Sequence, residues 1–102
     1  MKIAVAQTEI RQDDPAYNLQ KAERWIAEAA FNQAELILFP EMSFTGVTLN
    51  TAKVAEDPKD SRTVQRMKEL AKSYNLAIGF GWAASPEGEE KLVTNRFTLL
   101  DK

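Results

Sequence analysis

The chain has 102 residues, of which 44% are hydrophobic and 27% are charged, with a formal net charge of −2 and neither cysteine nor histidine. This is the composition of one small globular domain and not of a disordered segment. Without cysteine and histidine, these residues form no disulfide, Cys/His zinc site or Ser-His-Asp triad. They also lack the clustered lysines and arginines of a nucleic-acid-binding face, so we expect no nucleic-acid partner.

The N-terminal segment predicts a strand followed by a helix. Its apolar stretch is too short for a secretory signal or a membrane span, so we expect no membrane partner. The absence of cysteine is consistent with the cytoplasmic location that we expect. Residues 2–8, KIAVAQT, are apolar and partly β-branched, which is typical of a buried strand. Asp14 is suited to cap a helix and Pro15 to occupy its first position. Apolar residues then recur at helical spacing, which predicts an amphipathic helix over 15–33.

A second strand and a long loop come next. Residues 35–39, ELILF, are too few for a helix and are bounded by Pro40, which disfavours helical geometry at the residue before it. Residues 40–59 show no clean period and read as a loop. Loops of this length in compact domains are usually functional or disordered.

The C-terminal part predicts a helix and two strands. The helix is capped by Asp60 or Ser61 and ends at Asn75, a residue that often adopts left-handed geometry at a helix end. Residues 76–82, LAIGFGW, form the third strand, residues 83–90 a turn, and residues 91–100 the fourth strand.

The resulting order, β-α-β-α-β-β, predicts an α/β layer whose last two strands are antiparallel. Two helices cover one face of such a sheet, yet the first three strands are apolar on both faces. Alternation assigns Ile3, Val5, Leu36, Leu38, Ile78 and Phe80 to one face and Ala4, Ala6, Ile37, Phe39, Ala77 and Gly79 to the other. We therefore expect polypeptide outside these 102 residues to cover the second face.

Glu41 is the candidate site residue that the strand pattern singles out. It follows Pro40 at the carboxyl end of the second strand, where ligand groups gather in open α/β sheets. An apolar wall disfavours the charged form of a carboxylate, and this makes it a better general base near neutral pH. The alternative is an ordinary loop carboxylate that caps nearby N–H groups.

The segment around Glu41 resembles a known motif. Residues 36–46, LILFPEMSFTG, resemble the glutamate motif of the nitrilase, or carbon–nitrogen hydrolase, superfamily, in which an apolar strand leads into a Pro-Glu pair. Residues 2–7, KIAVAQ, resemble the opening strand of that family, and residues 76–81, LAIGFG, the strand after its second helix. The resemblance covers nearly the whole chain but only the front part of a family domain.

Asn95 carries a further part of the resemblance. In TNRFTLLD it resembles the asparagine of the family's Y-N-(S/T)-A strand. This sequence departs from the pattern, because Thr94 replaces the tyrosine and Arg96 and Phe97 replace the small residues. We expect Asn95 to hydrogen-bond the Glu41 loop and not to meet substrate.

The resemblance implies an α-β-β-α sandwich, of which residues 1–102 form an incomplete N-terminal part, with the second half absent. It also implies a Glu-Lys-Cys catalytic set: cysteine attacks a nitrile or amide carbon, glutamate is the general base, and lysine stabilises the oxyanion. Only the glutamate maps onto this chain, as Glu41. Neither Lys91 nor Lys102 matches the family's lysine, and the cysteine is absent as well. Without a thiol no acyl-enzyme forms, so we expect the isolated chain to be inactive.

Further expectations follow from the same resemblance. Pro40 and Asn95 support the site, and Phe44 and Thr45 either line the substrate entrance or pack the loop. The implied partners are a small linear amide or nitrile and further copies of the protein in a homo-oligomer. We expect no cofactor and no metal, since the acidic residues lie in separate loops without EF-hand spacing.

The sequence also raises two alternative functions. The first is a naturally truncated or degenerate relative that serves as a non-catalytic binding or assembly module, which the reading frame after Lys102 would distinguish from an enzyme. The second is a nucleotide-binding βαβ domain. The first strand-to-helix segment, QTEIRQDDP, contains no glycine, so the phosphate-binding loop of such a domain is missing.

Overall fold

A computed structural model describes residues 1–46, 54–85 and 93–102. The order of its elements confirms the predicted β-α-β-α-β-β series, with a short 3-10 helix before the second long helix. The elements are β1 (Ile3–Val5), α1 (Pro15–Phe31), β2 (Leu36–Leu38), η1 (Pro58–Asp60), α3 (Arg62–Tyr74), β3 (Ala77–Ala84) and β4 (Thr94–Leu100). The predicted turn began too early, because residues 83 and 84 belong to β3. Its remainder, residues 86–90, lies outside the described residues.

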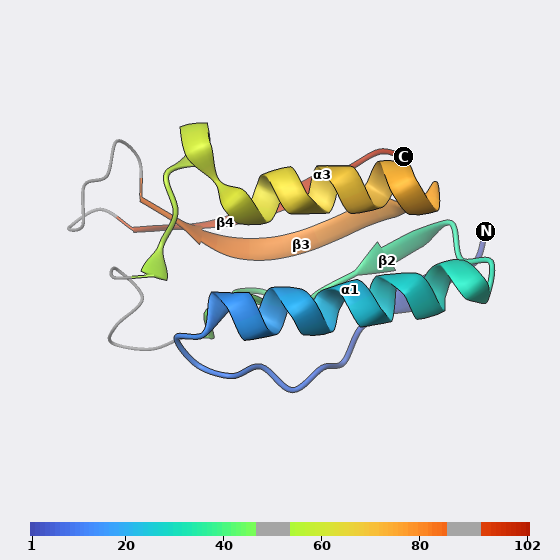
Figure 1. Cartoon of the computed structure of the whole chain (residues 1–102), viewed down its shortest axis with the longest axis horizontal. Helices are drawn as coiled ribbons and strands as arrows, with labels where there is room; N and C mark the ends of the chain where they lie inside the picture. Colours follow the sequence, from blue (N-terminus) through green and yellow to red (C-terminus); the bar gives the residue numbers. More distant parts are fainter. Residues whose placement is uncertain (47–53, 86–92) are drawn as a thin grey trace.

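The four strands form one sheet in the order β1-β2-β3-β4, with β1, β2 and β3 parallel and β4 antiparallel to β3. The helices α1 and α3 run side by side on the same face of this sheet (Figure 1). The parallel strands are joined through these helices, and β4, which is antiparallel to β3, forms one edge of the sheet. The chain thus builds two layers, one helical and one of strands.

Local sequence signals set the helix ends. Asp14 caps α1 by accepting a hydrogen bond from the main-chain N–H of Tyr17 at 3.2 Å, and Pro15 is the first helical residue. Ser61, and not Asp60, caps α3 by accepting from Val64 N–H at 3.1 Å. Asn75 ends α3 in the predicted left-handed conformation, with φ of 52°. These short-range interactions satisfy main-chain groups that a helix end leaves without partners.

The core lies between the helices and the sheet. Its largest fully buried side chains come from both layers, which is why each helix has an apolar stripe. They include Ile26 and Met67 from the helices, Ile37, Ile78 and Phe80 from the strands, and Leu76 between α3 and β3. Burying each of these side chains contributes about 1.5–3 kcal/mol.

The assignment of residues to the two sheet faces was partly wrong. Ile78 lies opposite Ile37, and both are buried under the helices, as is Phe80. Ile78 and Phe80 therefore lie on the face opposite to the one predicted for them. The error arises because the relative register of two parallel strands is set by long-range pairing, and a shift of one residue exchanges the faces.

The other sheet face is apolar and open. Val5, Leu38, Gly79 and Leu99 lie in register across all four strands on this face. Leu99 is 66% exposed and Val5 is 67% exposed, and Phe97, on the same side of β4 as Leu99, is 58% exposed. We call this surface the open sheet face. Its exposure agrees with the expectation that these residues do not cover both sides of the sheet.

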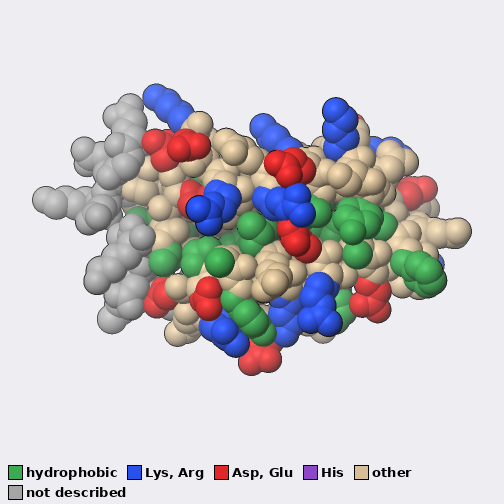
Figure 2. All heavy atoms as spheres, viewed as in Figure 1, with side chains coloured by type: hydrophobic (Ala, Val, Ile, Leu, Met, Phe, Trp, Pro, Cys, Tyr) green, Lys and Arg blue, Asp and Glu red, His purple; other side chains and the backbone are tan. Residues whose placement is uncertain are grey.

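The helix side of the molecule is different in character, with side chains of both charges spread over the helices (Figure 2). Arg66 on α3 pairs with Glu23 on α1 and, at 2.8 Å, with Glu69 on its own helix. Hydrogen bonds to Glu23 and Glu69 raise the pKa of Arg66 above its ordinary value. Within the described residues, no helix is long and apolar enough to cross a bilayer.

Candidate active site

Glu41 lies in a turn that continues directly from β2. The N–H of Phe39 donates to Gly79 O at 2.8 Å, which extends the pairing with β3 by one step, and the N–H of Ser43 donates to Gly81 O at 3.2 Å. Between Phe39 and Ser43 the chain leaves the sheet and forms a turn, residues 40–46, that contains Glu41. We call it the Glu41 turn. The carboxyl end of β2 and the middle of β3 thus fix its main chain.

Gly81 permits the close approach of this turn to β3. A Cβ atom on Gly81 would lie 2.8 Å from Glu41 Cα, 2.9 Å from Met42 N and 3.0 Å from Pro40 O. All three are main-chain atoms, so a side chain at position 81 would have to displace the turn itself. Gly81 is therefore part of the site, because a residue without a Cβ atom is needed where the turn lies this close to β3.

Asn95 on β4 reaches Glu41 across the sheet. Its side-chain Nδ2 donates a hydrogen bond to Glu41 Oε1, although the two residues are 54 positions apart in the chain. Asn95 pairs with Ala83 and shares its side of β4 with Phe97 and Leu99. The carboxylate and the amide therefore lie on the open sheet face, next to apolar side chains.

The turn is internally braced. Pro40 O accepts a hydrogen bond from the Ser43 hydroxyl, and Met42 O accepts from Gly46 N–H at 2.9 Å. Met42 and Gly46 both have positive φ, of 51° and 72°. A methionine in this conformation is uncommon and persists where surrounding contacts hold it.

Phe44 and Thr45 are buried. Phe44 packs in the core against Phe80, with ring centroids 5.8 Å apart in an edge-to-face arrangement, and only 1% of it is exposed. Thr45 is 3% exposed, and its hydroxyl donates to Gly46 O at 2.9 Å. The geometry favours loop packing for both residues, and the role of either in lining a substrate entrance stays a prediction.

Asn18, a buried residue of α1 that contacts the Glu41 turn, is a further site residue that the sequence pattern did not single out. Its Nδ2 donates to Phe44 O at 2.8 Å. The signal in the sequence is its spacing. Asn18 lies about one helical turn before Ala22 and about two before Ile26, so it is a polar residue on the buried stripe of α1.

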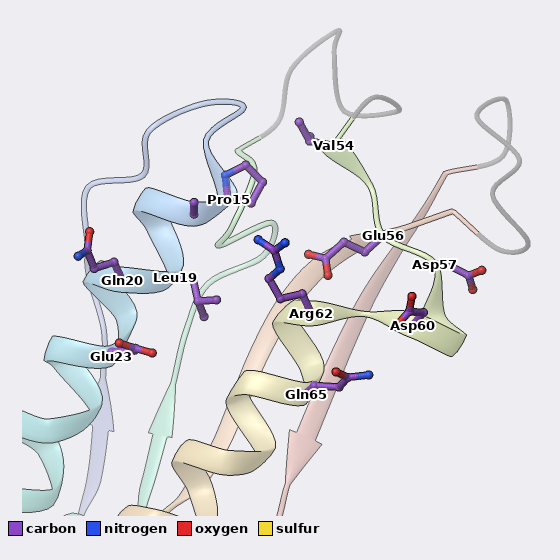
Figure 3. A pocket seen from close by; sticks show the side chains of 11 residues that line it. Pro15, Leu19, Gln20, Glu23, Val54, Glu56, Asp57, Asp60, Arg62 and Gln65 are labelled. Carbon is purple, nitrogen blue, oxygen red and sulfur yellow. The ribbon is translucent and has the colours of Figure 1, made fainter.

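A large cavity of the described structure lies away from Glu41. It is an open hollow of about 900 Å³ between the N-terminal parts of α1 and α3 (Figure 3). Glu56, which lines it, accepts hydrogen bonds from Ser61 and Thr63 and so is engaged in holding the start of α3. In the described segments no group of acidic side chains is arranged to hold a metal ion.

The fold and the site together define a class of protein: a nitrilase-type α/β sheet in which a Pro-Glu turn follows a parallel strand. The chain belongs to the carbon–nitrogen hydrolase family, whose model matches residues 2–102.

Individual relatives agree with this assignment. An (R)-stereoselective amidase of a Pseudomonas species is 32% identical over 90 residues, which cover 86% of this chain and 32% of the relative. A hydrolase of Mycobacterium tuberculosis is 34% identical over 96 residues, covering 93% of this chain and 32% of its own length.

Solved structures show the same fold. An amidase from a Nesterenkonia species superimposes with a TM-score of 0.84 at 25% identity, over 99% of this chain and 38% of its own. A superfamily protein from Xanthomonas campestris, with an arsenic adduct in its active site, has a TM-score of 0.84 at 26% identity, over 97% and 36%. The chain thus spans about a third of the length of the curated relatives it matches.

Proposed function

We propose that residues 1–102 form the incomplete N-terminal part of a carbon–nitrogen hydrolase that cleaves a small linear amide or nitrile, with Glu41 as its general base. The observation that carries this proposal is the pairing of Glu41 with Asn95 on the open sheet face. That face is where a second sheet would pack in an α-β-β-α sandwich, and packing there would enclose the carboxylate in an apolar surrounding.

The substrate class comes from the relatives. A cysteine-to-alanine variant of the Nesterenkonia amidase was solved in complex with butyramide, a short aliphatic amide. We therefore place an amide first and a nitrile second among substrates for the longer protein. We also expect the longer protein to form a homo-oligomer.

The chemistry proposed for the longer protein is that of the Glu-Lys-Cys set. Glu41 takes the thiol proton as the cysteine sulfur attacks the amide carbon. Collapse of the tetrahedral intermediate then forms a thioester and releases the nitrogen as ammonia, which carries away the transferred proton. Glu41 next takes a proton from water, whose oxygen attacks the thioester, and the products are a carboxylic acid and the restored thiol. A lysine stabilises the oxyanion in both steps.

The chain alone lacks the nucleophile, because it contains no cysteine. No thioester forms without a thiol, so we expect the 102-residue chain to release no ammonia from butyramide. The competing function is a truncated or degenerate binding and assembly module, which would need no thiol. In that case the open sheet face would serve to hold another protein and Glu41 would be a loop carboxylate.

The decisive experiment reads and expresses the gene beyond the codon for Lys102. We expect the frame to continue and to encode a lysine and then a cysteine, and we expect the longer product to release ammonia from butyramide. The 102-residue chain, assayed beside it, should show only the uncatalysed rate. A stop codon directly after Lys102, or a longer product without a cysteine, would contradict the enzyme and favour the binding module.

A further inference from the structure

Asn18 is a polar residue on the stripe of α1 that packs against the sheet. It is only 5% exposed, and the other buried positions of this helix are Ala22, Ile26 and Ala29. An aliphatic side chain would fill such a position without any need for partners, whereas a buried amide is unfavourable unless its polar atoms are paired. Helix packing alone therefore does not account for Asn18.

The Asn18 side chain is fully paired, and all its partners are main-chain groups. Nδ2 donates to Arg11 O at 2.7 Å and to Phe44 O at 2.8 Å, while Oδ1 accepts the N–H of Arg11 at 2.8 Å. Both amide hydrogens and the carbonyl oxygen are thus in use. The side chain links the loop before α1 to the turn that contains Glu41.

The same turn is anchored on its other side by β3. Ser43 N–H donates to Gly81 O at 3.2 Å, and Asp13 N–H donates to Thr45 O at 2.8 Å, which adds a second link to the loop before α1. A turn held at both ends has few positions available for Glu41. Catalytic groups need such support, because a displacement of about 1 Å is enough to lose productive geometry.

We infer that Asn18 is a positioning residue for Glu41: by holding the Phe44 carbonyl against α1, its side-chain amide fixes the turn that brings the Glu41 carboxylate to Asn95. That Glu41 serves as a base rests on the proposed function. That Asn18 fixes the position of Glu41 can be measured without an activity assay.

The test uses the NMR signal of the Asn95 side-chain amide in the 102-residue chain, at a concentration at which light scattering gives the mass of a monomer. Because this amide donates to Glu41 Oε1, its signal changes as the carboxyl group gains a proton, and Glu41→Gln should remove that change. In Asn18→Ala and Asn18→Asp, both donated bonds are lost, so the pH-dependent change of the Asn95 signal should shrink about threefold or more.

Ile26→Val is the matched control. Ile26 is fully buried in the core on the same helix, so its truncation weakens the packing of α1 and leaves every hydrogen bond to the turn in place. This variant should keep the change seen in the unaltered chain. An undiminished change in a folded Asn18 variant, or an equal loss in Ile26→Val, would overturn the inference.

Hydrogen exchange of the unaltered chain decides the matter if neither Asn18 variant folds. The Nδ2 protons of Asn18 and the N–H of Gly46 should then have similar protection factors, because the hydrogen bonds of both groups break when the turn opens. Asn18 protons that exchange like those of an exposed amide beside a protected Gly46 would refute the inference. Failure of the proposed function would give a different result. The longer protein would then be inactive, while the NMR and hydrogen-exchange results for Asn18 would still be those expected above.

Discussion

The Cα atom of Glu41 packs so closely on β3 that a Cβ atom on Gly81 would lie 2.8 Å from it. The neighbouring atoms that such a Cβ would also meet, Met42 N and Pro40 O, belong to the main chain. A close-packed main chain held at both ends transmits strain and does not yield as a flexible side chain does. Gly81 therefore determines how near the candidate base lies to the sheet.

Gly81→Ala should displace the turn and destabilise the fold. Overpacking against main-chain atoms costs about 1–3 kcal/mol, which urea denaturation of the 102-residue chain measures. The Asn95 side-chain amide signal should also lose its dependence on Glu41. Gly79→Ala is the control, since its Cβ would meet the end of the Leu38 side chain at 2.7 Å and the Phe97 ring at 3.1 Å. Equal effects of both substitutions on the Asn95 signal would show that Gly81 has no special relation to Glu41.

Asn95→Ala should separate stability from catalysis. Asn95 is exposed in this chain, so the free energy of unfolding should change by less than about 0.5 kcal/mol. In the longer protein proposed above, loss of the amide donor should lower kcat by about tenfold with a smaller change in KM, because the base is no longer oriented. Steady-state kinetics with butyramide give both constants. A kcat equal to that of the unaltered protein would mean that the contact with Glu41 has no part in the reaction.

The open sheet face should make the isolated chain self-associate. Replacing Val5 and Leu99 together by lysine places charge on an apolar surface and should return the chain to a monomer at the same concentration. Light scattering over a range of concentrations measures the mass.

Phe31→Lys is the matched control for that experiment. Phe31 is 87% exposed but lies at the end of α1, away from the sheet, so its replacement should leave the association unchanged. A monomer for the unaltered chain at every concentration would count against an uncovered sheet face.

The start of α3 gives a prediction on stability alone. Ser61 accepts a hydrogen bond from Val64 N–H and donates one to Glu56 Oε1. Ser61→Ala should therefore lower the free energy of unfolding by about 1 kcal/mol. Asp60→Ala removes the exposed neighbour, which does not cap the helix, and should have little effect. The reverse ranking in urea denaturation would assign the cap to Asp60.

Local signals made the helices predictable from the sequence. Asp14, Pro15 and Asn75 act on main-chain groups within a few residues of themselves, so the pattern and the cap residues were enough. The choice between Asp60 and Ser61 needed the structure, because either side chain is suited to cap from its position. The place of Glu41 at the end of β2 was predictable because Pro40 ends the strand.

Long-range relations were harder to predict. The face of Ile78 depends on its register with Ile37, which the sequence of neither strand contains. Asn18 presents only an amide on an apolar stripe, and its partners at Arg11 and Phe44 are brought to it by the fold. Phe44 follows the motif glutamate closely in sequence, yet its side chain points into the core.

The role proposed for Glu41, that of general base, is tested most directly by Glu41→Gln in the proposed longer protein, assayed by ammonia release from butyramide. Glutamine keeps the size of the side chain and removes its ability to take a proton. We predict a loss of about a hundredfold or more in kcat, with thermal unfolding unchanged. Activity near that of the unaltered protein, in a variant that is folded and binds butyramide, would contradict the assignment of Glu41 as the base.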